Sequence, residues 1–208
     1  MKWLLFATIA ATGTPAAADC ELHVWPAYGT GANTGGWLSN LGPAGAAADY
    51  ERNKDVNLRD QAALILALPP GAQAQALSEA DLPAILGMAG AKITFESRPL
   101  DARSIGRDRR RRTASKATCY AELIVALNFY RRSAVYGRQL TSHFAFKDYR
   151  SGATEAKIVG GKETHAVPLF PPESTAMEAQ SHEQLAAAFV ANVTEFARKI
   201  GKRKQAPH

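Results

Sequence analysis

The segment Tyr120–Tyr130 constrains the fold of this 208-residue chain most, because its apolar residues recur at every second position. One face carries Ala121, Leu123, Val125, Leu127 and Phe129. The other face carries Tyr120, Glu122, Asn128 and Tyr130. A period of two is typical of a β-strand with one buried face. After a turn over 131–137, a second alternating run predicts a long β-hairpin; its apolar face carries Leu140, Ser142, Phe144 and Phe146.

The C-terminal region has the period of an amphipathic helix. Ser181 and Gln184 form a capping-box pattern at its start. Apolar residues then follow at spacings of three and four: Leu185, Ala188, Phe189, Val193, Phe196 and Ile200. Because one face of the strand needs a cover, we expect this helix to pack on the apolar face that begins at Leu123.

Shorter patterns complete the predicted fold. Strands are expected at 22–28, 92–97 and 155–159, the last ended by two glycines, and helices from Asn57 to Pro69 and over 82–87. The segment Gly29–Ala48 is expected to be a long loop that carries Trp37. The order β-α-α-β-β-β-α favours an α+β fold: a two-layer sandwich in which amphipathic helices cover a mixed β-sheet with a long hairpin.

The N-terminus has the order of a secretory signal peptide. Lys2 precedes an apolar run over 3–11, and Ala16-Ala17-Ala18 offers small residues before a cut at Asp19. A buried N-terminal helix is the alternative. We therefore predict a signal peptide at 1–18, a single α+β domain at 19–200 and a basic tail at 201–208. Asp19 disfavours lipid attachment at the next cysteine. The alanine-rich composition points to a Gram-negative bacterium, and hence to the periplasm.

Two cysteines, Cys20 and Cys119, are present. Because export leads to an oxidising compartment, one disulfide is the simple prediction, and two buried free thiols are the alternative. If the cysteines are bonded, the first strand and the long strand begin side by side and run parallel.

Motifs for catalysis or metal binding are incomplete. Gly29-Thr30-Gly31 follows a predicted strand, but the third glycine and the helix of a dinucleotide loop are missing. His182-Glu183 begins like a zinc-protease helix, yet Ala186 stands where the second histidine would be. We therefore expect no catalytic residue, no metal and no cofactor.

The most unusual charge cluster contains Arg107, Arg109, Arg110, Arg111 and Arg112, in a chain of formal net charge +6. One interpretation is a docking patch for an anionic partner, either an envelope protein or an anionic membrane surface, since nucleic acid is not expected in the periplasm. The alternative is a solvated loop whose charges only aid solubility. A dibasic processing site is a third interpretation, for a eukaryotic source.

The hairpin also carries a resemblance. CYAELIVALNFY, the turn RRSAVYGR and QLTSHFAFKDYR follow one another over 119–150. This pattern resembles the periplasmic anticodon-binding-like domains, which include the N-terminal domain of TolB and the curli-secretion lipoprotein family. The chain is also similar to small exported alphaproteobacterial proteins of no assigned role. The lipid-bearing cysteine of the lipoprotein members is missing here. The resemblance implies an envelope-associated, non-catalytic scaffold.

Two functions remain open at this point. The first is an envelope interaction or assembly protein that binds through its sheet edge and its arginine-rich loop. The second is a small-molecule-binding protein or hydrolase that uses the segment Gly29–Ala48 as a lid over the sheet.

Overall fold

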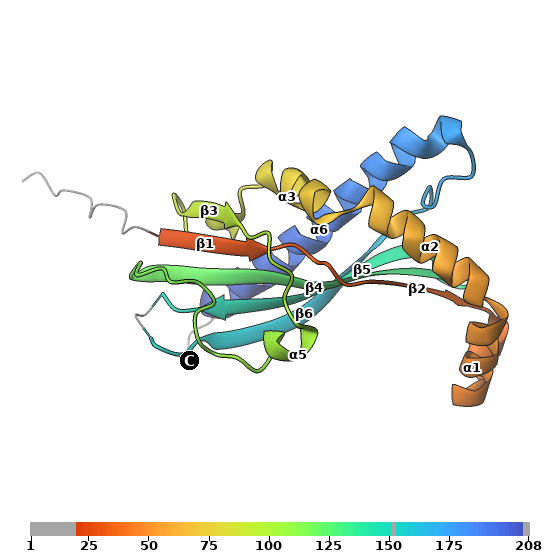
Figure 1. Ribbon diagram of the computed structural model, residues 1–208, viewed down its shortest axis with the longest axis horizontal. Helices are drawn as coiled ribbons and strands as arrows, with labels where there is room; N and C mark the ends of the chain where they lie inside the picture. Colours follow the sequence, from red (N-terminus) through yellow and green to blue (C-terminus); the bar gives the residue numbers. More distant parts are fainter. Residues whose placement is uncertain (1–19, 151–152, 206–208) are drawn as a thin grey trace, which may run out of the picture.

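The computed structural model describes residues 20–150 and 153–205, so the predicted signal peptide lies outside the described residues. The described strands form one mixed sheet in the order β3-β1-β4-β5-β6, with β2 also paired to β4 (Figure 1). Their bounds are β1 Cys20–Trp25, β2 Thr30–Gly35, β3 Lys92–Phe95, β4 Cys119–Ser133, β5 Gly137–Asp148 and β6 Lys157–Ala166.

The helices gather mostly on one face of this sheet. They are η1 Trp37–Leu41, α1 Pro43–Arg52, α2 Lys54–Ala67, α3 Pro70–Ser78, α4 Leu82–Ile85, α5 Ala102–Ile105, η2 Thr175–Met177 and α6 Glu178–Gln205. Figure 1 shows α2, α3 and α6 on the same side of the strands. The predicted α+β sandwich is thus confirmed. None of the helices within 20–150 and 153–205 is long and apolar enough to cross a membrane.

The long strand β4 organises the sheet. β1 and β2 follow each other along one edge of β4, both parallel to it, and β5 pairs antiparallel along the other edge. Cys20 and Cys119 occupy paired positions of β1 and β4, with Cα atoms 4.4 Å apart, and are joined by a disulfide. The predicted bond and the predicted parallel strands are both present.

A β-bulge interrupts the alternation of β4. The register with β5 shifts between Val125 and Leu127. Beyond the bulge the faces exchange, so Asn128 and Tyr130 are buried and Leu127 is only half-buried. Because a shift of one residue turns every later side chain to the other face, the prediction of a single apolar face through Phe129 is wrong after Val125.

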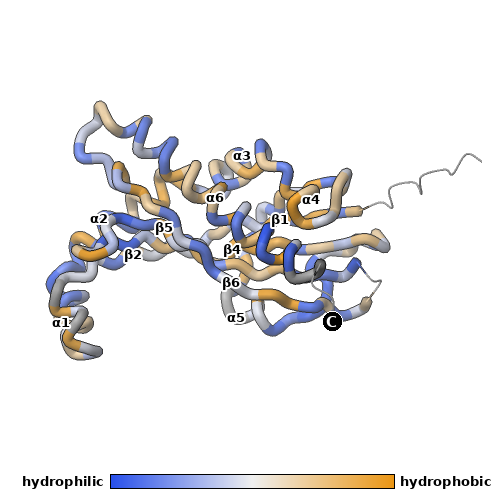
Figure 2. Tube along the Cα trace, turned by 180° about the vertical axis from the view of Figure 1, so that it is seen from behind, coloured by the Kyte–Doolittle hydropathy of each residue, from blue (hydrophilic) through white to orange (hydrophobic). Residues whose placement is uncertain are grey.

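The core lies between the sheet and the helices. Leu123 and Val125 share one cluster of buried residues with Leu185, Phe189 and Phe196, which confirms that α6 covers this face. The short helix α4 adds the buried Leu82 to the same cluster, and Leu86 directly after it does so too; most residues of α4 are apolar (orange in Figure 2).

The start of α6 differs from the predicted capping box. The helix begins at Glu178, so Ser181 lies inside its first turn and is fully buried. Gln184 accepts a hydrogen bond from the backbone N–H of Leu169 (2.8 Å) and thus holds the preceding loop. The helix also continues through Gln205 into the predicted basic tail.

Two further local predictions are wrong. Asn57 does not begin a helix: α2 starts at Lys54, and the Asn57 side chain accepts a hydrogen bond from the N–H of Thr34 (2.7 Å). Gly160 and Gly161 do not end a strand, because β6 runs through them to Ala166. At Gly161 an added Cβ would lie 2.7 Å from the Phe196 ring, so the glycine allows the strand to pass against α6.

The segment Gly29–Ala48 is not a loop. It forms β2, η1 and the first half of α1. Asp49 holds this region together, because its carboxylate accepts hydrogen bonds from both the N–H (2.6 Å) and the hydroxyl (2.7 Å) of Ser39. The side chain of Trp37 lies outside the described residues. A lid over the sheet therefore has no counterpart in this part of the structure.

Candidate functional site

The candidate site is the layer between the sheet and the arginine segment, which we define as residues 101–118. This segment crosses the face of the sheet opposite the helices. A small apolar cluster joins the two, in which Ile105 of the segment packs against Trp25, Ile124 and Ala145 of the strands. The central strands are consequently buried on both faces, and the polar groups between segment and sheet must find partners there.

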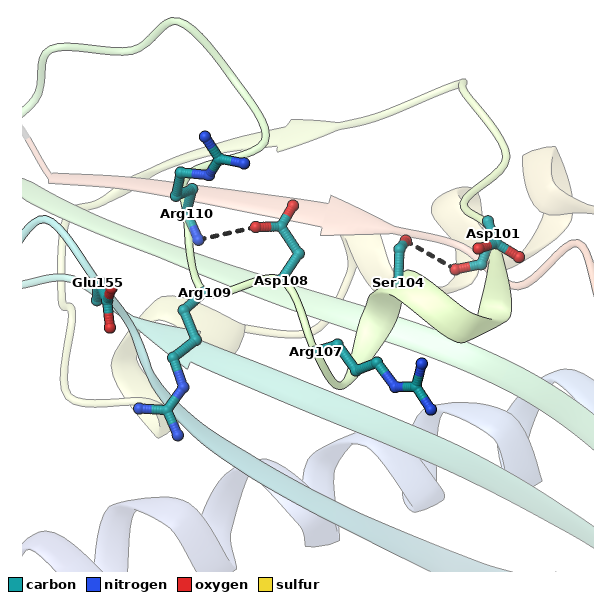
Figure 3. Close-up of a pocket in the computed structure, with 7 residues that line it drawn as sticks. All are labelled: Asp101, Ser104, Arg107, Asp108, Arg109, Arg110 and Glu155. Atoms are coloured by element: carbon teal, nitrogen blue, oxygen red, sulfur yellow. Dashed lines mark hydrogen bonds between the residues drawn. The ribbon is translucent and has the colours of Figure 1, made fainter.

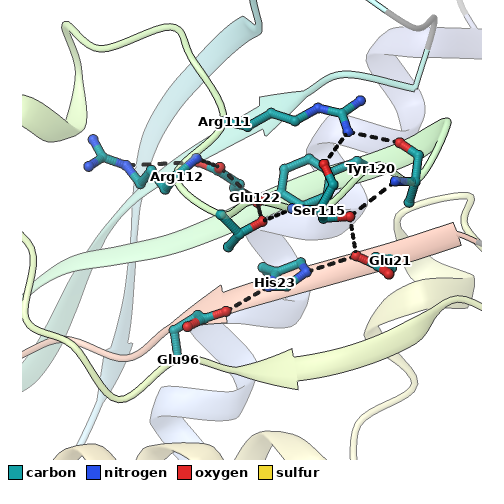
Figure 4. Close-up of polar contacts among 10 residues, drawn as sticks. Glu21, His23, Glu96, Arg111, Arg112, Ser115, Tyr120 and Glu122 are labelled. Carbon is teal, nitrogen blue, oxygen red and sulfur yellow. Dashed lines mark hydrogen bonds and ion pairs between the residues drawn. The ribbon is translucent and has the colours of Figure 1, made fainter.

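Arg111 is turned toward the protein rather than toward solvent. Its guanidinium carbon lies 4.8 Å from the ring centre of Tyr120 and 5.6 Å from that of Tyr149. Its Nη1 donates to the backbone carbonyls of Ser115 (3.1 Å) and Ala117 (2.8 Å), as Figure 4 shows in part. A cation above two aromatic rings, with its hydrogen bonds made inside the segment, stabilises a fixed conformation.

Arg112 also holds the segment on the sheet through hydrogen bonds. Its backbone N–H donates to Oε1 of Glu122 (2.7 Å), and its Nη2 donates to the carbonyl of Ser104 (2.9 Å). Its Nε lies 3.8 Å from Oε2 of Glu122. The interpretation of Arg111 and Arg112 as parts of an exposed patch is thus replaced by a role in holding the segment on the sheet.

Beneath Arg112, Glu122 and Lys147 form a cross-strand pair of β4 and β5. Both side chains are 0% exposed, and Nζ of Lys147 lies 3.8 Å from Oε2 of Glu122. Nζ also donates to the carbonyl of Asp108 (2.5 Å) and so ties the segment to β5. Burial raises the pKa of the Glu122 carboxyl and lowers that of the Lys147 ammonium. We call Arg112, Glu122 and Lys147 the buried ion cluster.

A second polar chain lies beside the cluster; it joins β1, the residue after β3 and the arginine segment. His23 has Glu96 at Nδ1 (2.7 Å) and Glu21 at Nε2 (3.1 Å), and the hydroxyl of Ser115 donates to Glu21 (2.5 Å) (Figure 4). The hydrogen bond from Ser115, and then the one from His23, lower the pKa of Glu21. The serine bonds to a carboxylate and not to the histidine, so this arrangement lacks the nucleophile–base contact of a hydrolase and latches the segment to β1.

Three arginines of the segment remain at the surface. Arg107, Arg109 and Arg110 are exposed. With other polar residues they line an open hollow of about 540 Å³, completed by Asp101, Ser104, Asp108 and Glu155 (Figure 3). In Figure 3 the side chains of Arg107 and Arg109 point to one side of the segment and Arg110 to the other. The backbone N–H of Arg110 holds the pKa of Asp108 below its usual value.

The described histidines do not form one cluster. His23 belongs to the chain described above, while Nδ1 of His165 lies 2.7 Å from Oδ1 of Asn192 on α6. His182 lies on α6 and lines, together with His165, a groove between α3 and α6. Among residues 20–150 and 153–205, no three potential ligands of the His, Cys, Asp and Glu types come together to hold a metal ion.

Sequence reasoning missed Glu122 and Lys147 as partners. The hairpin pattern could have revealed this pair, because Glu122 and Lys147 fall opposite each other when 120–130 is paired with 139–149. Opposite charges at directly paired positions near the open end of a long hairpin indicate a contact. Their complete burial could not be inferred, since it depends on the segment that covers them.

Comparisons with known proteins add little. No family model matches the chain, and no curated protein matches it. One solved structure, described as "Crystal structure of uncharacterized protein", is 8% identical and superposes with a TM-score of 0.31 over 90% of this chain and 93% of that chain. A likeness at this level carries no conclusion. The resemblance of the hairpin to anticodon-binding-like envelope domains stays a prediction.

Proposed function

We propose that this protein is an exported, non-catalytic interaction protein of the periplasm, which docks an acidic region of an envelope protein through Arg107, Arg109 and Arg110. The suggested signal peptide and the Cys20–Cys119 disulfide support export to an oxidising compartment. The resemblance to anticodon-binding-like envelope domains is part of the same proposal.

The observation that carries the proposal is the anchoring of the arginine segment. Arg111 and the buried ion cluster fix its backbone on the side that faces the sheet. On the side that faces solvent, Arg107, Arg109 and Arg110 are exposed. A surface held in its bound conformation loses little entropy when a partner binds. Arginine is also enriched in protein interfaces.

The mixed charge of the hollow favours a protein over a membrane as the partner at this place. Asp101, Asp108 and Glu155 line it together with the three arginines. A uniformly anionic surface would meet these carboxylates unfavourably. A protein can place acidic groups at the arginines and other groups at the carboxylates.

The test is crosslinking in the native periplasm, followed by identification of partners, with the variant R107S/R109S/R110S. The control variant R59S/K92S/R198S removes the same number of exposed positive charges elsewhere. We expect the first variant to lose a crosslinked partner that wild type and control retain, and the complex to weaken as salt rises. Retention of every partner by the arginine variant would contradict the proposal.

The design leaves Arg111 and Arg112 unchanged for a structural reason. The sequence alone suggests that serine could replace Arg109–Arg112 without harm to the fold, but Arg111 and Arg112 hold the segment. Export itself is tested by sequencing the N-terminus of the protein from the periplasm. We expect a start at or near Asp19, and an intact Met1 would contradict export with cleavage.

A further inference from the structure

The turn between β4 and β5 exposes apolar side chains. Val135 is 69% exposed and Tyr136 is 65% exposed. Glycine, asparagine, aspartate, serine and proline dominate such turns, because these residues suit the backbone and the solvent. A β-branched residue next to an aromatic one therefore needs another reason at this position. We call residues 134–136 the hairpin tip.

The hairpin tip has a defined conformation. The hydroxyl oxygen of Ser133 accepts hydrogen bonds from the N–H of Val135 (3.3 Å) and of Tyr136 (2.9 Å). Gly137 follows with φ of +68°, a value that suits glycine, and pairs with Ser133 to close the hairpin. The two apolar side chains are thus presented on a held turn and do not fold back onto the body.

Other apolar groups lie at the same end of the molecule. Ser39 of η1 lines a small hollow together with Val135 and Tyr136, so η1 and the tip are neighbours. Leu41, at the end of η1, is exposed, and so is Tyr50 on α1. The exposed apolar residues thus come from three neighbouring elements.

Exposed charged residues lie at this end as well. Arg131 is exposed at the base of the tip. Asn53, at the junction of α1 and α2, donates to the carbonyl of Thr34 on β2, and β2 pairs with the same end of β4. Arg52 and Lys54, on either side of Asn53, are both exposed. Glu51 and Asp55, next to Arg52 and Lys54 in the sequence, are exposed too, so this end offers apolar groups among charges of both signs with a small positive excess.

We propose that the hairpin tip docks the protein on an anionic phospholipid bilayer. Val135 and Tyr136 enter the headgroup region, and Arg131, Arg52 and Lys54 meet lipid phosphates. Tyrosine suits this place because its ring favours the interface between water and hydrocarbon. Basic residues near the surface are attracted by anionic lipid within a Debye length. This proposal stands on a different surface from the arginine segment and does not depend on it.

The test is cosedimentation of the protein, purified after export, with vesicles of phosphatidylglycerol and phosphatidylcholine or of phosphatidylcholine alone. We expect binding to the anionic vesicles to fall at least tenfold in V135S/Y136S and to fall with salt in wild type. The matched control L58S/L66S, which removes two exposed leucines of α2, should bind as wild type. The three proteins should share one unfolding midpoint, since these side chains lie outside the core.

A second variant reports directly whether the hairpin tip contacts lipid. In Y136W, tryptophan fluorescence should shift to shorter wavelength on addition of anionic vesicles and should be quenched by brominated lipid. Equal vesicle binding by wild type and V135S/Y136S would overturn the proposal. So would a concentration-dependent dimer that only wild type forms without lipid, because a second copy would then cover the tip. Vesicle binding lost in R107S/R109S/R110S but kept in V135S/Y136S would also overturn it.

Discussion

Removal of the carboxylate from the buried ion cluster should destabilise the protein more than removal of the ammonium. Glu122→Gln removes the buried carboxylate between Lys147 and Arg112 and leaves them with the carboxylate of Asp108 as a nearby counter-charge. Lys147→Met leaves Glu122 with Arg112 still 3.8 Å away. Breaking a buried pair by removing one partner costs about 3–5 kcal/mol. We expect Glu122→Gln to fall in that range and Lys147→Met below it.

The coupling free energy between Glu122 and Lys147 can be estimated from the distance between their charges. Unit charges about 4 Å apart interact by about 4 kcal/mol at an effective dielectric constant of about 20. The distance between Lys147 Nζ and Glu122 Oε2 is 3.8 Å, and both side chains are fully buried. Because Arg112 shares the carboxylate, we expect a coupling free energy of about 2–3 kcal/mol, within the range found for contacting residues.

The assay is a double-mutant cycle of denaturant unfolding at neutral pH with Glu122→Gln, Lys147→Met and the double variant. The control cycle uses Glu173→Gln and Arg138→Met, a partly exposed pair at 2.7 Å. Exposed pairs contribute about 0–1 kcal/mol, so this coupling should be small. A coupling below about 0.5 kcal/mol between Glu122 and Lys147 would refute the reasoning, because it would mean that the buried pair is not ionised.

Three further outcomes are expected. Phe189→Ala should lower the free energy of unfolding by about 3–5 kcal/mol because its ring is fully buried between α6 and the sheet, and an unchanged denaturation midpoint would contradict this. Reduction of the Cys20–Cys119 bond, which joins residues 99 apart, should cost about 4–5 kcal/mol in the same assay, and mass spectrometry with alkylation should find no free thiol beforehand. The pKa of Glu21 is lowered from 4.5, so its contribution to stability is present above that pH and is lost as the pH falls through the lowered value. The difference in the free energy of unfolding between wild type and Glu21→Gln should therefore become smaller as the pH falls. A difference that does not change with pH would show that the hydrogen bonds at Glu21 do not stabilise its ionised form.

The sequence predicts the strands of the hairpin but not the bulge in β4, for a reason that lies outside the hairpin. β1 pairs with β4 only as far as Ile124, and β2 takes up the same edge from Asn128. The bulge between Val125 and Leu127 falls in the gap between these partners, where the chain passes from β1 to β2. Local alternation contains no information on where a neighbouring strand ends, so the exchange of faces at Tyr130 could not be derived from it.

The arginine segment shows a similar limit. A run of arginines without an apolar period favours a solvated loop, and three of the five residues do lie at the surface. The other two are held by groups that the folded sheet brings to them: the ring of Tyr149 for Arg111, and the buried carboxylate of Glu122 for Arg112. Helix α6 was predictable because its period alone defines its buried face. The segment was not, because its partners are defined only by the assembled sheet.

The two proposed surfaces lie toward opposite ends of the same strand pair. The arginine segment is fixed at Glu122, and the hairpin tip begins after Ser133. Strands rise about 3.3 Å per residue, so these points are separated by roughly 35 Å along β4, less the local effect of the bulge. This distance exceeds the Debye length of about 8–10 Å at physiological ionic strength, so the charges of one surface are screened from the other. A protein docked on lipid by its tip would keep the exposed arginines clear of the bilayer and open to a partner. The effects of V135S/Y136S on vesicle binding and of R107S/R109S/R110S on crosslinking should consequently be independent, and a variant that combines them should show each loss unchanged.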